Sequence, residues 1–111
     1  MALEGVWTSE IYGLFGWENT GVLMLKDGHA VGGGNNHVSV GTYSIDESEV
    51  QMLLEIEYHG PPRTMFGAAE KKLKVALKGK TGDGVVEGVV HRSDKPDLSL
   101  SFRLTRRGAL P

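Results

Sequence analysis

The sequence contains no cysteine, which excludes disulfide bonds, thiolate nucleophiles and thiolate metal sites. A chain without cysteine suits a reducing compartment. The first residues, MALEGVWTSE, lack the basic segment followed by an apolar segment that marks a secretory signal. No apolar run approaches the length of a membrane span. We therefore expect a soluble, cytoplasmic protein with no membrane partner.

The sequence also lacks a net basic charge. Its 12 Lys and Arg residues are balanced by 14 Asp and Glu residues, which gives a formal net charge of -2. This balance creates no overall field that would attract a nucleic-acid backbone. The basic residues gather in two groups, with no interleaved aromatic side chains of the kind that stack on bases: Lys71, Lys72, Lys74, Lys78 and Lys80, then Arg103, Arg106 and Arg107. We expect no direct nucleic-acid partner.

Glycine, in contrast, is abundant, with 16 glycines spread over 111 residues. A chain of this length is typical of one domain, here residues 1–111. The glycines separate segments in which apolar and polar residues alternate, the pattern of a strand with one solvated face. The clearest segments are 50–59, 72–78 and 98–105, and weaker candidates are 3–14, 21–26, 29–33, 37–44 and 85–92. The sequence therefore predicts about eight short strands.

Eight successive strands joined by tight turns must hide their edges, and an up-and-down barrel removes edges altogether. We predict an all-β fold, a single eight-stranded antiparallel barrel with at most one short helix, placed at residues 64–74. A β-sandwich is the alternative. A barrel of this size is either filled by side chains or holds one small ligand. The bulky candidates for its interior, Trp7, Met24, Met52, Leu54 and Phe102, predict a largely filled core.

The segment LKDGHAVGGGNNHVSVG, residues 25–41, combines five glycines with two histidines. Asp27 and Gly28 lie between two β-type runs, which predicts a hairpin with a type I′ turn. The glycines at 32–34 lead into another strand instead of opening a helix, so a phosphate-binding loop is not favoured. These glycines predict a bulge or a sharp corner of the barrel.

Two histidines in this segment, His29 and His37, raise the possibility of a metal site. Spacing marks no third ligand, so the favoured interpretation is a pair of solvated histidines at strand ends. We predict no metal and no cofactor.

Four segments in order, GVWTSEIYG, TGVLMLKDGHAVGGG, VGTYS and LSLSFRLTRR, resemble the GrlR-like family of small bacterial proteins over nearly the whole chain. The resemblance implies a lipocalin-like barrel that forms homodimers. It also implies a negative regulator that binds a protein partner, such as a transcriptional regulator, and performs no catalysis.

In that family an exposed acidic run is implicated in the contact with the partner. Its nearest counterpart here is Asp46, Glu47, Ser48 and Glu49, which the resemblance makes a candidate partner-binding turn. The alternative is that these are ordinary turn residues, favoured for local hydrogen bonding and solvation.

Two aromatic residues, Phe15 and Trp17, fall in a predicted loop at residues 14–19. They are candidates for a dimer interface or for the mouth of the barrel, because aromatic residues are enriched at interfaces. Local packing is the alternative.

Two other functions compete with the regulatory module. The first is a carrier of one small apolar ligand, whose cavity would be lined by Trp7, Met24, Met52, Leu54 and Phe102. The second is an enzyme with His59 or His91 as a base. Spacing offers no nucleophile and acid beside either histidine, so we predict no catalytic residues.

Overall fold

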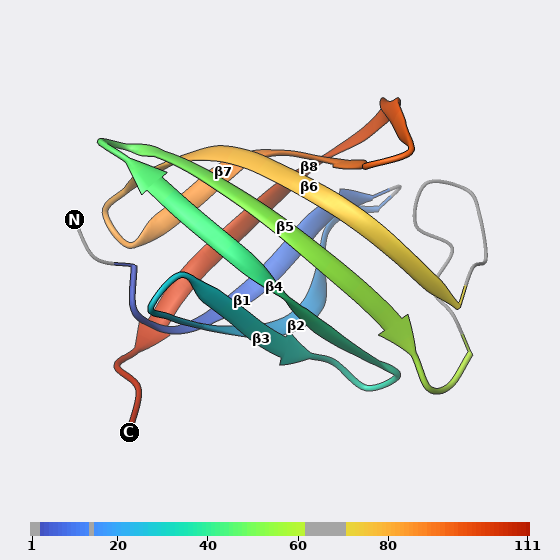
Figure 1. Ribbon diagram of the computed structural model, residues 1–111, viewed down its shortest axis with the longest axis horizontal. Helices are drawn as coiled ribbons and strands as arrows, with labels where there is room; N and C mark the ends of the chain where they lie inside the picture. The colour runs from blue at the N-terminus through green and yellow to red at the C-terminus, as the bar shows by residue number, and fades with distance from the viewer. Residues whose placement is uncertain (1–2, 14, 62–70) are drawn as a thin grey trace.

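The computed structural model describes residues 3–13, 15–61 and 71–111. Each strand pairs antiparallel with the next, and β8 pairs with β1 to close the sheet into a barrel (Figure 1). The strands are β1 (Gly5–Gly13), β2 (Gly16–Lys26), β3 (His29–Gly33), β4 (His37–Asp46), β5 (Glu49–Tyr58), β6 (Lys72–Gly82), β7 (Val85–Arg92) and β8 (Lys95–Gly108). The predicted eight-stranded antiparallel barrel is confirmed, and its closure excludes the sandwich.

The described residues contain no helix. This part of the chain therefore has no helix that is long and apolar enough to cross a membrane. The predicted short helix at 64–74 lies mostly outside the described residues. At its far end the prediction is wrong, because β6 begins at Lys72. Leu73 is buried in the barrel and pairs with Ile56 of β5, so strand pairing takes precedence over the helical pattern.

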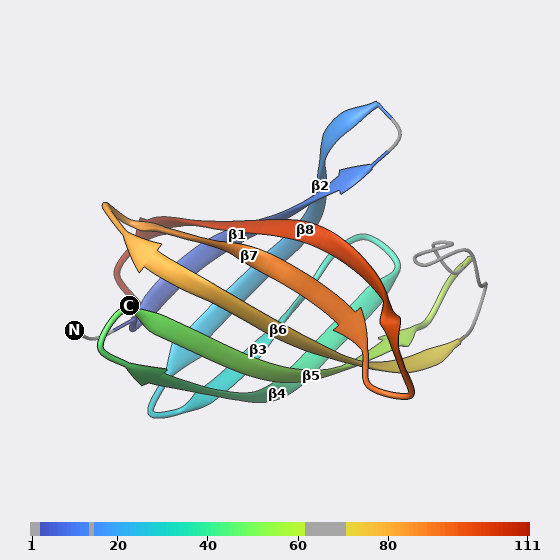
Figure 2. The same ribbon diagram turned by 90° about the horizontal axis from the view of Figure 1, so that it is seen from above.

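The β1–β2 hairpin extends further than the sequence indicates. We expected a loop at 14–19, but β2 begins at Gly16, and Trp17 pairs with Tyr12 across the hairpin. Leu14 lies outside the described residues. The two rings pack edge to face with centroids 5.4 Å apart, a favourable aromatic geometry that supports this extension. Figure 2 shows the end of the hairpin standing out from the barrel.

The turn and the glycines within residues 25–41 allow backbone conformations and close strand contacts that other residues would hinder. Asp27 and Gly28 have φ values of 50° and 80°, as the predicted type I′ turn requires. A Cβ on Gly32 would overlap the carbonyl oxygen of Val22 on the neighbouring strand. Only glycine allows β2 and β3 to approach so closely here.

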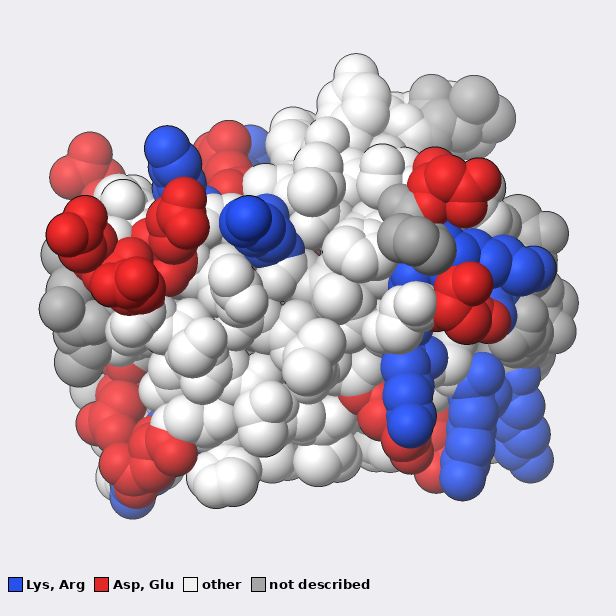
Figure 3. All heavy atoms as spheres, turned by 45° about the horizontal axis from the view of Figure 1, so that its top comes forward, with Lys and Arg blue, Asp and Glu red and all other residues white. Residues whose placement is uncertain are grey.

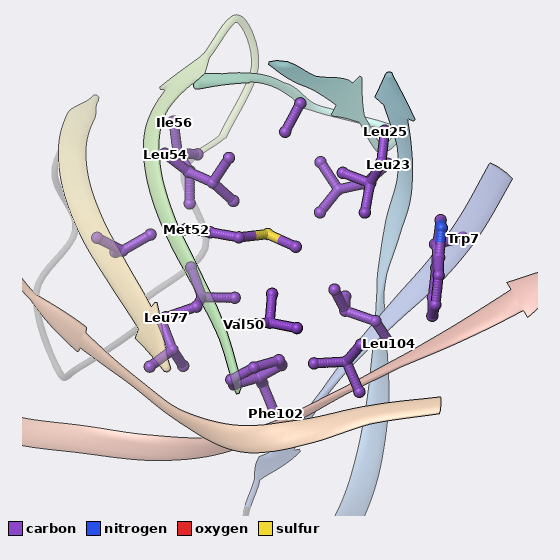
Figure 4. Packing of buried hydrophobic residues seen from close by; sticks show 14 of the residues in the cluster. Trp7, Leu23, Leu25, Val50, Met52, Leu54, Ile56, Leu77, Phe102 and Leu104 are labelled. Carbon is purple, nitrogen blue, oxygen red and sulfur yellow. The ribbon is translucent and has the colours of Figure 1, made fainter. Parts of the chain in front are cut away.

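The turns at 27–28, 47–48 and 83–84 lie together at one end of the barrel (left in Figure 1), which we call the closed end. The side chains of Trp7, Leu25 and Val86 are almost fully buried toward this end. Trp7 is buried there and its Nε1–H donates to the carbonyl of Leu3 over 2.9 Å. Side chains from several strands, including Val50, Met52 and Leu104, point into the interior (Figure 4). We call the opposite end, which holds the β3–β4 loop at 34–36, the open end.

Candidate functional site

A small cavity remains inside the barrel toward the open end. Its volume is about 60 Å³, and its walls are mainly apolar, with Leu54 and Phe102 among them. Ser39 and Tyr58 contribute polar groups. A cavity that binds one benzene molecule measures about 150 Å³, and sites for larger ligands measure about 300–1,000 Å³. This cavity therefore has room for a few waters or a short alkyl group.

The five residues predicted to line a cavity have three different positions. Leu54 and Phe102 line it. Trp7 and Met52 are buried in the core but do not contribute to the lining. For Met24 the prediction is wrong, because its side chain is 42% exposed on the outer surface of β2. Successive residues of a strand face opposite sides, and its neighbours Leu23 and Leu25 occupy the interior.

Met24 belongs instead to an exposed apolar surface on the outside of the barrel. In the register of β2, β3 and β4, Met24 lies opposite Val31, and Val31 lies opposite Val40. Further exposed apolar side chains flank this row. We call the whole set the apolar wall: Val22, Met24, Val31, Val38, Val40 and Leu53. Contiguous exposed apolar patches are typical of interaction sites.

The outer surface of the next two strands, β5 and β6, differs in kind. Here Glu49 lies opposite Lys80, Glu55 opposite Lys74, and Glu57 opposite Lys72. Unlike charges directly opposite each other stabilise strand pairing by roughly 0.2–1 kcal/mol per pair. The charged residues on this surface thus stabilise the pairing of β5 with β6 and keep the surface solvated. Because charged residues are depleted in the core of protein interfaces, this surface is not favoured as an interaction site.

The acidic run predicted to bind a partner forms the β4–β5 turn at the closed end. Asp46, Glu47, Ser48 and Glu49 are all exposed, and the backbone N–H of Thr81 donates to the carbonyl of Ser48 over 2.8 Å. That bond joins this turn to the end of β6. Figure 3 shows acidic side chains gathered at this end of one face, with basic side chains mainly toward the other end.

Phe15 and Trp17 lie on the projecting β1–β2 hairpin. Phe15 is 91% exposed. Trp17 is held between Tyr12 and Arg103, whose guanidinium carbon lies 4.3 Å from the centre of a Trp17 ring. Arg103 also forms an ion pair with Glu10 at 3.1 Å. Local packing therefore accounts for Trp17, whereas Phe15 offers an apolar side chain to solvent.

The polar mouth of the open end is a pocket of about 720 Å³. It lies between the β3–β4 loop, the middle of β2 and the end of β5. It adjoins the inner cavity, with which it shares four residues: Thr20, Val22, His37 and Tyr58. The rings of His37 and Tyr58 are 5.6 Å apart at an angle of 53°. Asn35 and Asn36 form its outer rim.

The two histidines of residues 25–41, His29 and His37, lie at different places along the wall of the barrel. His29 pairs with Thr42 and His37 with Tyr58, so the two imidazoles are separated by the stretch of β4 from 37 to 42, roughly 17 Å. Among the described residues, no three His, Asp or Glu side chains are grouped to hold a metal. His59 is exposed, and His91 is half-buried on β7.

One charged pair lies at the β7–β8 turn of the open end. The Arg92 side chain is buried, and its Nε and one terminal nitrogen donate to the two carboxylate oxygens of Asp94, each over 3.0 Å. These hydrogen bonds from Arg92 lower the pKa of Asp94 below its ordinary value. The pair anchors the chain where it turns from β7 into β8.

The fold and these surfaces define a small closed β-barrel with a packed interior, a polar mouth and one apolar outer wall. No protein-family model matches the chain, and no curated protein matches it. The residues themselves therefore carry the functional argument.

Proposed function

We propose that this chain is a small, non-enzymatic protein-interaction module that acts as a homodimer, with the apolar wall as the surface between the two copies. The exposed row of Met24, Val31 and Val40 across three adjacent strands carries the proposal. A soluble barrel gains nothing from exposing such a row to water, since covering it releases hydration at roughly 25 cal/mol per Å².

A second copy suits this wall in chemistry and in size. A two-fold dimer places the same patch on both subunits, and an apolar patch is complementary to itself. Charged residues border it: Lys26 lies beyond Met24 on β2, and Glu55 follows Leu53 on β5. The barrel extends over 36 × 29 × 26 Å, so one side of it is large enough for the ~800 Å² per partner of a standard interface.

The acidic turn at Asp46, Glu47, Ser48 and Glu49 is the proposed contact for a different protein partner. Its support is its full exposure at the closed end, away from the open mouth. The resemblance to the GrlR-like family supports a regulatory role for that contact, with a transcriptional regulator as the kind of partner. The alternative of an apolar carrier is not favoured by a cavity of about 60 Å³.

The test is sedimentation of the purified protein at micromolar concentration, with a matched pair of charge variants. Val31 on β3 and Val89 on β7 are both 47% exposed, but Val89 lies between Lys78 and Ser101 instead of between apolar residues. In the dimer, Val31→Lys would bury an unpaired ammonium group at a cost of several kcal/mol. We expect its dissociation constant to rise at least ~100-fold.

Val89→Lys should leave the dimer unchanged, because that residue lies outside the apolar wall. A wild-type protein that sediments as a monomer would contradict the proposal. If Val31→Lys has the same dissociation constant as the wild type and Val89→Lys, another surface holds the two copies together.

A further inference from the structure

The open end of the barrel offers a second binding geometry beside the apolar wall, with which it shares Val22. The mouth pocket measures about 720 Å³, within the range of about 300–1,000 Å³ that small-molecule sites occupy. It is a wide, half-open hollow, and the narrow inner cavity of about 60 Å³ lies against it. The two spaces share lining residues, so a molecule in the mouth could extend a short group inward.

The described lining of the mouth is polar, and its one residue of a basic type is His37. None of the described residues around it is Asp, Glu, Lys or Arg. The side-chain amides of Asn35 and Asn36 are exposed on the β3–β4 loop and form no hydrogen bond with other described side chains or backbone. An amide offers both donors and an acceptor without charge, which matches hydroxyl groups and does not favour an ion.

The loop that presents these amides is held by its backbone. The Gly34 N–H donates to the carbonyl of His37 over 3.1 Å, and the His59 N–H donates to the carbonyl of Asn36 over 2.8 Å. Two hydrogen bonds thus fix the loop to its own strand and to the end of β5. A fixed loop lowers the entropy cost of binding, since its side chains start from a constrained backbone.

The inner cavity limits what can enter beyond the mouth. Its walls include Leu54, Val90 and Phe102, which favour an apolar group. Its volume admits a chain of only two or three carbons, well below the ~150 Å³ that accommodates benzene. The site thus combines a broad hydrogen-bonding entrance with a short apolar end.

We propose that the open end of the barrel binds a small, neutral, polyhydroxylated molecule, of the sugar type, that carries a short apolar substituent. The hydroxyl groups bind at the Asn35 and Asn36 amides, and the substituent enters the cavity beside Val90. The mouth and the apolar wall share Val22, but the Asn35 and Asn36 amides that bind the hydroxyl groups lie on the β3–β4 loop, outside the wall.

The experiment is a titration followed by backbone amide chemical shifts, with three related sugars. Ethyl glucoside has the neutral head and the short chain, glucose lacks the chain, and ethyl glucuronide carries a carboxylate. We expect saturable shifts with ethyl glucoside at the amides of Thr20 and residues 33–36, with a dissociation constant of about 1 mM, ordinary for a ligand of this size. Glucose should bind more weakly, and ethyl glucuronide weakest.

Two variants and one control locate the site. Asn36→Ala should weaken ethyl glucoside five- to tenfold, about the effect of one hydrogen bond. Val90→Ile should reduce the affinity for ethyl glucoside toward that for glucose, because the added methylene group fills the inner cavity. The affinity for glucose should not change, since glucose has no group that enters this cavity. Gln51→Ala removes an exposed amide from the outside of β5 and should change neither affinity.

Three results would overturn the proposal. The first is the absence of saturable shifts with ethyl glucoside. The second is equal or tighter binding of ethyl glucuronide, which would mean that the site prefers an anion. The third is binding that Asn36→Ala leaves intact in a variant whose spectrum retains the folded pattern.

Discussion

The two ends of this barrel are built from the same strands and yet differ in how completely they are filled. At the closed end, Trp7, Leu25 and Val86 are among the side chains almost entirely removed from water. At the open end the same interior contains a cavity and continues into a pocket whose lining includes three glycines and three asparagines. One barrel thus has a well-packed end and an end with free space.

The difference between the two ends indicates that the closed end supplies stability and the open end is available for binding. Close packing supplies most of the free energy of folding, and it leaves no space for a ligand. Binding residues are commonly placed on loops that a rigid scaffold positions. The closed end therefore serves as the scaffold that positions the loop at 34–36.

The largest effect is expected from Trp7→Ala at the closed end. The indole is almost fully buried and donates a hydrogen bond to Leu3, so its removal leaves a cavity and an unpaired carbonyl. We expect a loss of about 3–5 kcal/mol in the free energy of unfolding by urea.

Trp17→Ala is the matched comparison, because these are the protein's two tryptophans and Trp17 is 36% exposed. Trp17→Ala should lower the free energy of unfolding by about 1–2 kcal/mol, because it removes one aromatic pair and one cation–π contact. Each variant retains a single tryptophan whose fluorescence reports its environment. If the two variants lose equal stability, the closed end is not the better-packed part.

A smaller and more specific effect is expected from adding one methylene at each end of β7. Val86 is fully buried at the closed end, whereas Val90 lines the cavity. Val86→Ile should destabilise by about 1–3 kcal/mol, because no space receives the added group. Val90→Ile should be neutral or stabilise by about 0.5–1 kcal/mol, as cavity-filling changes do. Urea midpoints at a constant slope measure both variants, and destabilisation of similar size at both positions would remove the contrast.

The sequence predicts the barrel well because its signals are local. Alternation defines the strands, and the Asp27–Gly28 pair defines a turn whose two φ values are positive in the structure. The resemblance to a family, the homodimer and the partner-binding turn remain predictions, because they depend on molecules other than this chain.

The sequence does not predict which side chains face the interior where a strand is apolar at every position. Residues 22–25 read Val-Leu-Met-Leu, a run that is apolar at every position, so alternation cannot tell which face is buried. Pairing with β1 and β3 places Leu23 and Leu25 inside and Met24 outside. The apolar wall is missed for the same reason, since it arises only when three strands lie in register. The mouth likewise joins Thr20, Asn36 and Tyr58 from separate segments.

The smallest effect is expected from Asp94→Asn at the open end, and it should depend on pH. The hydrogen bonds from Arg92 lower the pKa of Asp94 in the folded state, so the carboxylate stabilises the fold at every pH above the ordinary Asp value of about 3.9. This contribution is lost as the pH falls through the lowered pKa of the folded state. The variant should therefore be slightly less stable than the wild type at neutral pH and equal to it in strong acid.

Asp97→Asn provides the control, since it removes the same charge from an exposed position on β8. Parallel urea titrations at neutral and acidic pH separate the ion pair from the general effect of net charge. Because the Asp94 carboxylate is exposed to solvent, screening keeps its effect small, which agrees with an open end that contributes little to the stability of the barrel. A loss from Asp94→Asn as large as that from Trp7→Ala would mean that the β7–β8 turn, and not the packed closed end, controls unfolding.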